Sequence, residues 1–360
     1  MAARRTVIEL IAVGLAARVC LIAGTLLGKG ISVQHYLLSS DAPSYVAVAR
    51  ALLTGVRPES AWHERVFLGW PMLIALPGAL IGHEAAALWL AVLLAALVPV
   101  SSFALPDDRP VSLLLAVLTP TWLMHSSLGM GEPAFLALQL LALLAWSRGR
   151  PLQGSAWASA AMVVRPTAFF VWLAIALADL RAHRRPRLTL LVAPAAATGL
   201  VLLCNAALYS DPARQLHAYS GIPNIKAEHL AALQQLPGPD GHHGLPLLHV
   251  LATPFVIEVA TWKVAFIWAH LAAVIAACAI GIRRRERSEL ERAMLLWALC
   301  STAFIVSTGP YWGFHTFDRY VVWALPAYAY LVRDRLPRST WMIAALGAVS
   351  FALALWSRLR

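Results

Sequence analysis

The sequence predicts an all-α polytopic membrane protein, and three observations lead to this fold class. Hydrophobic residues make up 60% of the 360-residue chain, whereas charged residues make up only 13%. Mean hydropathy is +0.68, so the chain has too few polar side chains to coat a soluble globule. The apolar residues also form long uncharged runs, each close to the ~20 residues that a helix needs to span a bilayer. Three such runs are 85–105, 188–208 and 265–282.

The basic residues indicate which ends of these helices face the cytoplasm. The formal net charge is +11, and the arginines gather between apolar runs, as at 181–187 and 283–287. Short arginine-rich loops are typical of the cytoplasmic side, so this charge indicates membrane topology and not nucleic-acid binding. The four cysteines lie inside apolar runs, which argues against a disulfide framework and against a CxxC metal site.

The first predicted helix covers residues 6–27, with the N-terminus in the cytoplasm. The first outer loop follows at 29–83 and contains two short elements. Asp41 begins an amphipathic surface helix that has proline in its first turn and stops at Gly55. The run 67–81 is too short to span and contains glycine and proline, so it suits a re-entrant or surface segment.

The remaining apolar runs complete a single transmembrane domain over residues 1–360, with about 10 or 11 membrane-spanning helices. The run 111–126 is predicted to cross the membrane. The run 154–179 is interrupted at Arg165, because a residue before proline is pushed out of helical geometry. We therefore expect two short half-spans that meet near the outer face, and a second outer loop at 209–249.

Acidic residues in the outer segments are functional candidates, because a charge near the membrane is costly. Asp41 is either a helix N-cap or a general base that deprotonates an attacking hydroxyl. Glu132 stands directly before a proline at the start of an apolar helix. It is either a residue that the helix dipole favours or a catalytic carboxylate, since two neighbouring glycines allow a ligand to approach the backbone.

Basic and titratable side chains in the same outer segments are candidates for binding substrate. Arg165 is either an interfacial arginine or a phosphate contact, for which its planar charged group is suited. His315 and Arg319 are four residues apart and share a face if helical, although Asp318 can also pair with Arg319. The expected substrate-binding residues are Arg165, His315, Arg319, His63, Glu64, Arg65 and Tyr45, of which 63–65 can equally form a solvated loop.

Short segments in a fixed order along the chain carry a family resemblance. The segments are 41–49, 67–71, 127–132, 164–167 and 317–320, the last followed by Leu325 and Pro326. They resemble motifs of the GT-C glycosyltransferases, membrane enzymes that use polyprenyl-phosphate sugars, and in particular the GPI mannosyltransferase II family and its bacterial relatives. Two positions depart from that family, with Leu68 in place of proline and Gly131 in place of serine.

The resemblance implies a GT-C-like bundle and an inverting sugar transfer on the extracytoplasmic face of the plasma membrane. Asp41 would be the general base, and Glu132 would orient the acceptor or assist the base. Arg165, His315 or Arg319 would hold the lipid phosphate that leaves. The donor would be a polyprenyl-phosphate-linked sugar, mannose by resemblance, and the acceptor a lipid, a glycan or a protein. Some members of the family use a divalent metal such as Mg²⁺ or Mn²⁺, which two carboxylates can hold.

Two alternatives remain open at this point. A transporter or flippase of a polyprenyl-linked or anionic lipid needs a polar path and usually shows internal repeats, whereas here no repeat is found and the polar groups cluster at one face. The other alternative is a GT-C transferase of another sugar, such as aminoarabinose, which the sequence distinguishes poorly from a mannosyltransferase. The sequence contains no Walker A, GxSxG or HExxH motif where an ATP-driven pump or a familiar hydrolase needs one.

Overall fold

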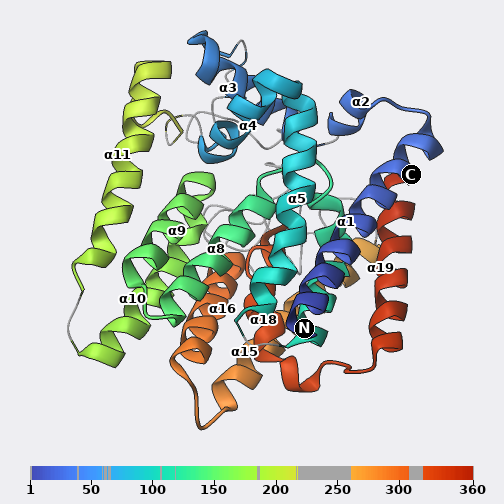
Figure 1. Cartoon of the computed structure of the whole chain (residues 1–360), viewed down its shortest axis with the longest axis vertical. Helices are drawn as coiled ribbons and strands as arrows, with labels where there is room; N and C mark the ends of the chain where they lie inside the picture. The colour runs from blue at the N-terminus through green and yellow to red at the C-terminus, as the bar shows by residue number, and fades with distance from the viewer. Residues whose placement is uncertain are drawn as a thin grey trace, which may run out of the picture. The chain divides into compact units, whose positions relative to one another are not determined.

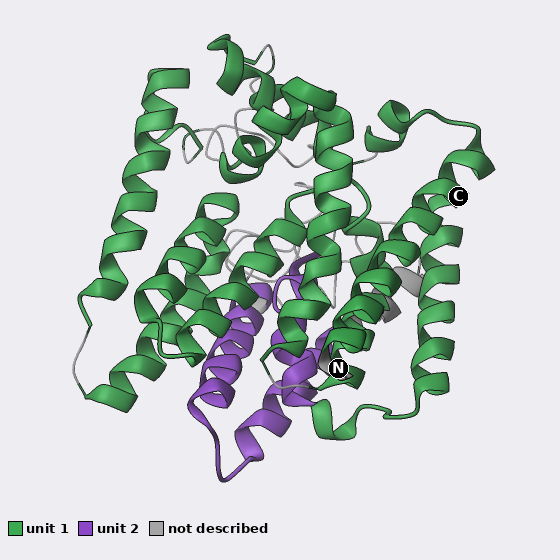
Figure 2. Cartoon of the chain, viewed as in Figure 1, with its two compact units in different colours: residues 1–220, 333–360 green, residues 221–332 purple. Residues whose placement is uncertain are grey.

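The computed structural model confirms the all-α class, since the part of the chain that it describes contains helices and no strands. The described residues are 2–38, 40–58, 60, 63, 66–105, 108–117, 119–184, 187–215, 217, 261–307 and 319–359. The chain divides into two compact units, which are unit 1 (residues 1–220 and 333–360) and unit 2 (residues 221–332; Figure 2). One domain over residues 1–360 stays a prediction.

Unit 1 holds most of the described helices. They are α1 (Ala2–Lys29), α2 (Val33–Leu37), α3 (Ala42–Thr54), α4 (Gly69–Ile81), α5 (His83–Phe103), α6 (Arg109–Val117), α7 (Pro120–His125), α8 (Glu132–Ser147), α9 (Pro151–Val164), η2 (Pro166–Ala168), α10 (Phe169–His183), α11 (Thr189–Tyr209), η3 (Arg333–Arg335) and α19 (Thr340–Leu359). In unit 2 the described helices are α15 (Thr261–Arg283), α16 (Glu289–Ser307) and α18 (Leu325–Leu331).

Four of the described helices are long and apolar enough to cross a membrane, and all four belong to unit 1. They are Arg4–Lys29 within α1, together with α5, α11 and α19. Many of their apolar side chains are exposed, as expected where lipid replaces water as the solvent. The membrane character predicted from composition is therefore supported, whereas the total of 10 or 11 spans, the plasma membrane and the orientation stay predictions.

Two groups of elements lie at opposite ends of unit 1. Figure 1 shows the end of α1, together with α3 and α4, at one end of this unit. The end of α10, the start of α11 and η3 lie at the opposite end.

The predicted surface helix forms within one residue of the expected bounds. Asp41 occupies the N-cap position, Pro43 lies in the first turn, and Gly55 ends α3 with a left-handed φ of 69°. The buried face includes Tyr45 and Val48, as predicted, while Leu53 is 43% exposed. This helix packs on α4 and α5, which fixes the position of its first turn within unit 1.

Two interrupted helices shape the interior of unit 1. Arg165 is extended (φ −153°, ψ 126°) before Pro166, so the predicted break separates α9 from α10. The run 111–126, expected as one crossing segment, is also broken, because Thr119 caps α7 and Pro120 begins it. α8, α9 and α10 have 16, 14 and 15 residues, so at ~1.5 Å per residue each is shorter than the hydrocarbon core is thick.

Candidate functional site

The first turn of α3 carries three polar side chains on one face, because Asp41, Ser44 and Tyr45 are spaced three and four residues apart. The Asp41 carbonyl accepts the Ser44 and Tyr45 amides at 3.0 and 3.3 Å. Its carboxylate, however, makes no capping hydrogen bond with the helix. Asp41 therefore occupies the cap position without the side-chain contact that the capping interpretation invokes.

Arg165 joins this turn to the start of α8. Its Nη2 donates a hydrogen bond to Glu132 Oε1 at 2.6 Å and lies 3.4 Å from the Tyr45 hydroxyl. The side chain of Glu132 is completely buried, whereas that of Arg165 is 13% exposed. Three of the predicted site residues are thus in contact, although they are separated by as many as 120 positions in the chain.

The backbone around this cluster is close-packed. The Nε1–H of Trp70 donates to the Gly129 carbonyl at 2.9 Å, which fastens α4 to the turn before Glu132. Gly69 lies so close to α9 that a Cβ there would be 2.5 Å from the Val164 amide nitrogen. Gly129 has a φ of +68°, which favours glycine. Segments 67–71, 127–132 and 164–167 of the resemblance therefore meet in one place.

Hydroxyl groups link the start of α3 to the same turn. The Ser40 hydroxyl, next to Asp41, donates to the Leu128 carbonyl at 3.2 Å. The Tyr36 hydroxyl and Ser127 Oγ are 3.1 Å apart. Burial raises the pKa of Tyr36, so its hydroxyl stays protonated at physiological pH. These contacts hold Asp41 and the turn that carries Glu132 in one packed region.

His63 is the described member of the predicted group 63–65. Its Nδ1 lies 2.9 Å from the Ser44 hydroxyl, so it reaches the same turn of α3 as Asp41. Glu64 and Arg65 lie outside the described residues.

The remaining predicted residues belong to unit 2 or to undescribed segments. Arg319 belongs to unit 2, where it is the first described residue after the gap at 308–318, and it is partly buried. The structure does not relate Arg319 to the cluster in unit 1. His315 lies outside the described residues. The predicted outer loop 209–249 is described only at its beginning, where the Arg57 guanidinium lies over the Tyr209 ring at 5.9 Å.

The donor set of the described residues does not form a metal site. Among these residues no group of three or more His, Cys, Asp or Glu side chains could hold an ion. The Glu132 carboxylate already faces a guanidinium, whose positive charge opposes binding of a cation at the same oxygen.

Two polar residues of unit 1 are not among the candidates that the sequence predicts. Ser44 could have been noticed, since it lies one turn after Asp41. Arg18 is the one arginine in the apolar run 6–27 and is completely buried, donating to Ser126 Oγ at 2.8 Å and to the Gly14 and Ala116 carbonyls. A single arginine within a spanning run is itself the signal that could have identified it.

No family model matches the chain, and no curated protein matches it significantly.

Proposed function

We propose that this chain is an inverting, polyprenyl-phosphate-sugar-dependent glycosyltransferase of the GT-C type. The observation that carries the proposal is the contact between Arg165, Glu132 and Tyr45, one turn from Asp41. A permanently charged guanidinium suits the oxygens of a lipid phosphate and can stabilise the negative charge of that leaving group. The order of the five resemblance segments along the chain supports the same function, as does the meeting of 41–49, 67–71, 127–132 and 164–167 in unit 1.

The proposed reaction consumes one acceptor hydroxyl and one lipid-linked sugar. The Asp41 carboxylate takes the hydroxyl proton while the acceptor oxygen forms a bond to the anomeric carbon. The bond between that carbon and the phosphate oxygen breaks on the opposite face, which inverts the anomeric centre. The polyprenyl phosphate leaves with the bonding electron pair, and the positive charge of Arg165 stabilises it.

Glu132 has a positioning role in this proposal. Its side chain is completely buried and contacts Arg165 Nη2 at 2.6 Å, so it reaches substrate through Arg165. The carboxylate fixes one nitrogen of the guanidinium and leaves the other donors of the group directed elsewhere. The Tyr45 hydroxyl of α3 contacts Arg165 Nη2 at 3.4 Å and so restricts the orientation of the guanidinium.

The test is transfer of label from polyprenyl-phosphate-mannose in membranes that contain equal amounts of each variant. We expect Asp41→Asn to lower transfer roughly 10²- to 10⁴-fold, since a positioned general base contributes that factor. Asp334→Asn is the matched control, because Asp334 is 61% exposed and lies outside this cluster. Transfer by Asp41→Asn at the wild-type rate would remove Asp41 from the chemistry. If the wild type transfers no label from mannose, aminoarabinose or other lipid-linked sugars, the proposed function is wrong.

A further inference from the structure

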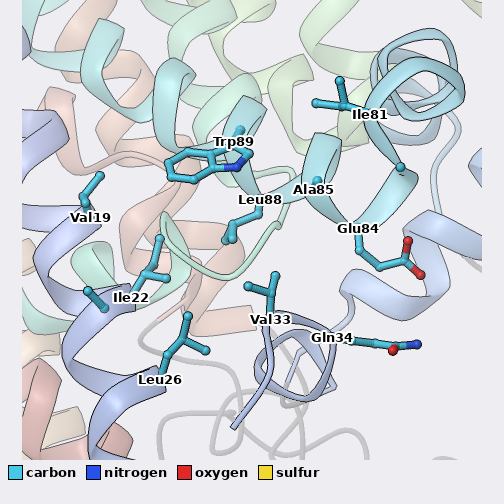
Figure 3. A pocket seen from close by; sticks show the side chains of 12 residues that line it. Val19, Ile22, Leu26, Val33, Gln34, Ile81, Glu84, Ala85, Leu88 and Trp89 are labelled. Carbon is cyan, nitrogen blue, oxygen red and sulfur yellow. The ribbon is translucent and has the colours of Figure 1, made fainter. Parts of the chain in front are cut away.

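A groove of about 600 Å³ opens on unit 1 between α1, α2 and the start of α5 (Figure 3). Apolar side chains line most of it, among them Ile22 and Leu26 of α1 and Leu88 of α5. Its volume lies within the range of small-molecule binding sites. Val19 and Trp89, which lie away from Glu84 and Gln34, are 40% and 46% exposed, so the groove is open along its side (Figure 3).

The apolar part of the groove lies between two helices of membrane-spanning length and composition, α1 and α5. From Val19 to Leu26 it follows α1 for roughly 10 Å at 1.5 Å per residue. Ile22 and Leu88 belong to a buried cluster of unit 1, so the floor of the groove is firmly packed. Within a bilayer, the abundant partner for an open apolar surface between two spanning helices is a hydrocarbon chain.

Polar groups stand at the other end of the groove. Figure 3 shows Glu84 and Gln34 on one side, away from Val19 and Trp89. Glu84 Oε1 pairs with Arg50 Nη2 at 2.6 Å, and the two side chains are 29% and 54% exposed. Arg50 is not among the lining residues, but this ion pair holds it beside Glu84, which lines the groove. The pair uses one guanidinium nitrogen and one carboxylate oxygen, and both side chains keep exposed surface.

We propose that this groove binds a glycerophospholipid with an ammonium head group, such as phosphatidylethanolamine. One acyl chain lies along α1 and α5, the phosphate meets Arg50, and the ammonium meets Glu84. The opposite charges of this ion pair match the opposite charges of the head group, and Gln34 can hydrogen-bond to either. This site is independent of the proposed sugar transfer.

The same charges predict an order of preference among lipids. A phosphatidylglycerol head group has the phosphate but offers no cation to Glu84. Phosphatidylcholine has a cation, but its quaternary nitrogen carries no N–H to donate to the carboxylate. Phosphatidylethanolamine alone of the three satisfies both groups with charge-assisted hydrogen bonds.

The experiment is native mass spectrometry of the purified full-length chain in micelles with equal amounts of the three lipids, matched in acyl chains. We expect the wild type to retain phosphatidylethanolamine about two- to fivefold over phosphatidylglycerol, the factor that one exposed ion pair supplies. Glu84→Gln should abolish this preference. Ala85→Trp should fill the groove and reduce retention of all three lipids, whereas Leu97→Trp, at a 43% exposed position of the same helix, should not.

Two results would overturn the proposal. One is equal retention of the three lipids by the wild type, which would indicate non-selective lipid around an apolar surface. The other is a preference for phosphatidylethanolamine that survives Glu84→Gln. Because Glu84 is partly exposed, this variant keeps the test valid even if the tryptophan substitution prevents folding.

Discussion

The buried ion pair between Arg165 and Glu132 gives a quantitative prediction. Replacing Glu132 with Gln keeps the shape of the side chain but removes its charge, so the guanidinium loses its partner at 2.6 Å. The substitution tests whether the pair holds three segments of unit 1 together, because α3, α8 and the break after α9 meet there.

The expected cost follows from burial. Removing one partner of a buried ion pair typically costs about 3–5 kcal/mol, because the other charge stays desolvated without compensation. The Arg165 side chain is 13% exposed, so water reaches part of the charge left behind. We therefore expect Glu132→Gln to lower the free energy of unfolding by about 3 kcal/mol, at the lower end of that range.

A double-mutant cycle separates this interaction from other effects of each substitution. The variants are Glu132→Gln, Arg165→Met and the double variant, with unfolding in mixed micelles followed by the fluorescence of the 14 tryptophans. We expect a coupling energy of about 2 kcal/mol, within the range found for residues in direct contact. The control is the same cycle on Arg50 and Glu84, which have the same 2.6 Å separation but side chains that are 54% and 29% exposed.

The control pair should show coupling of no more than about 1 kcal/mol, because water and salt screen exposed charges. Equal coupling in the two cycles would refute the reasoning, since it would mean that burial does not strengthen the pair. Independent, additive effects of Glu132→Gln and Arg165→Met would show that the contact does not stabilise the fold.

Two further predictions concern the packing and the pH dependence of unit 1. Gly69→Ala should destabilise the protein by about 1–3 kcal/mol, because the new Cβ would lie 2.5 Å from the Val164 amide nitrogen. Gly199→Ala, in the interior of α11 with nothing within 4 Å of the new Cβ, should instead stabilise the protein by up to about 1 kcal/mol in the same unfolding assay. Similar effects of both substitutions would contradict the close approach. The hydrogen bond from His217 lowers the pKa of Asp211, so this carboxylate stabilises the fold above its ordinary pKa of about 3.9 and ceases to do so as the pH falls through the lowered value. The stability difference between wild type and Asp211→Asn should therefore shrink below pH 4, and a difference that is constant from pH 6 to pH 3 would exclude this contribution.

Local signals in the sequence are sufficient to predict where several helices begin and end. The surface helix was expected from Asp41 to Gly55 and forms over Ala42–Thr54, because proline and a left-handed glycine act on their immediate neighbours. The break at Arg165 follows in the same way from the steric effect of Pro166 on the residue before it. The interruption at Thr119 was missed, although a capping residue followed by proline is an equally local signal.

The sequence by itself thus determined the helical class, the membrane character and those local breaks, since composition and steric rules operate over a few residues. It named Tyr45, Glu132 and Arg165 as candidates, but only the tertiary structure decided that they touch. Their contacts span 33 and 120 positions, and such contacts depend on how α3, α8 and α9 pack. The same holds for the pairing of Ser44 with His63 and for the groove between α1 and α5. Long-range packing selects these partners, and no local pattern encodes it.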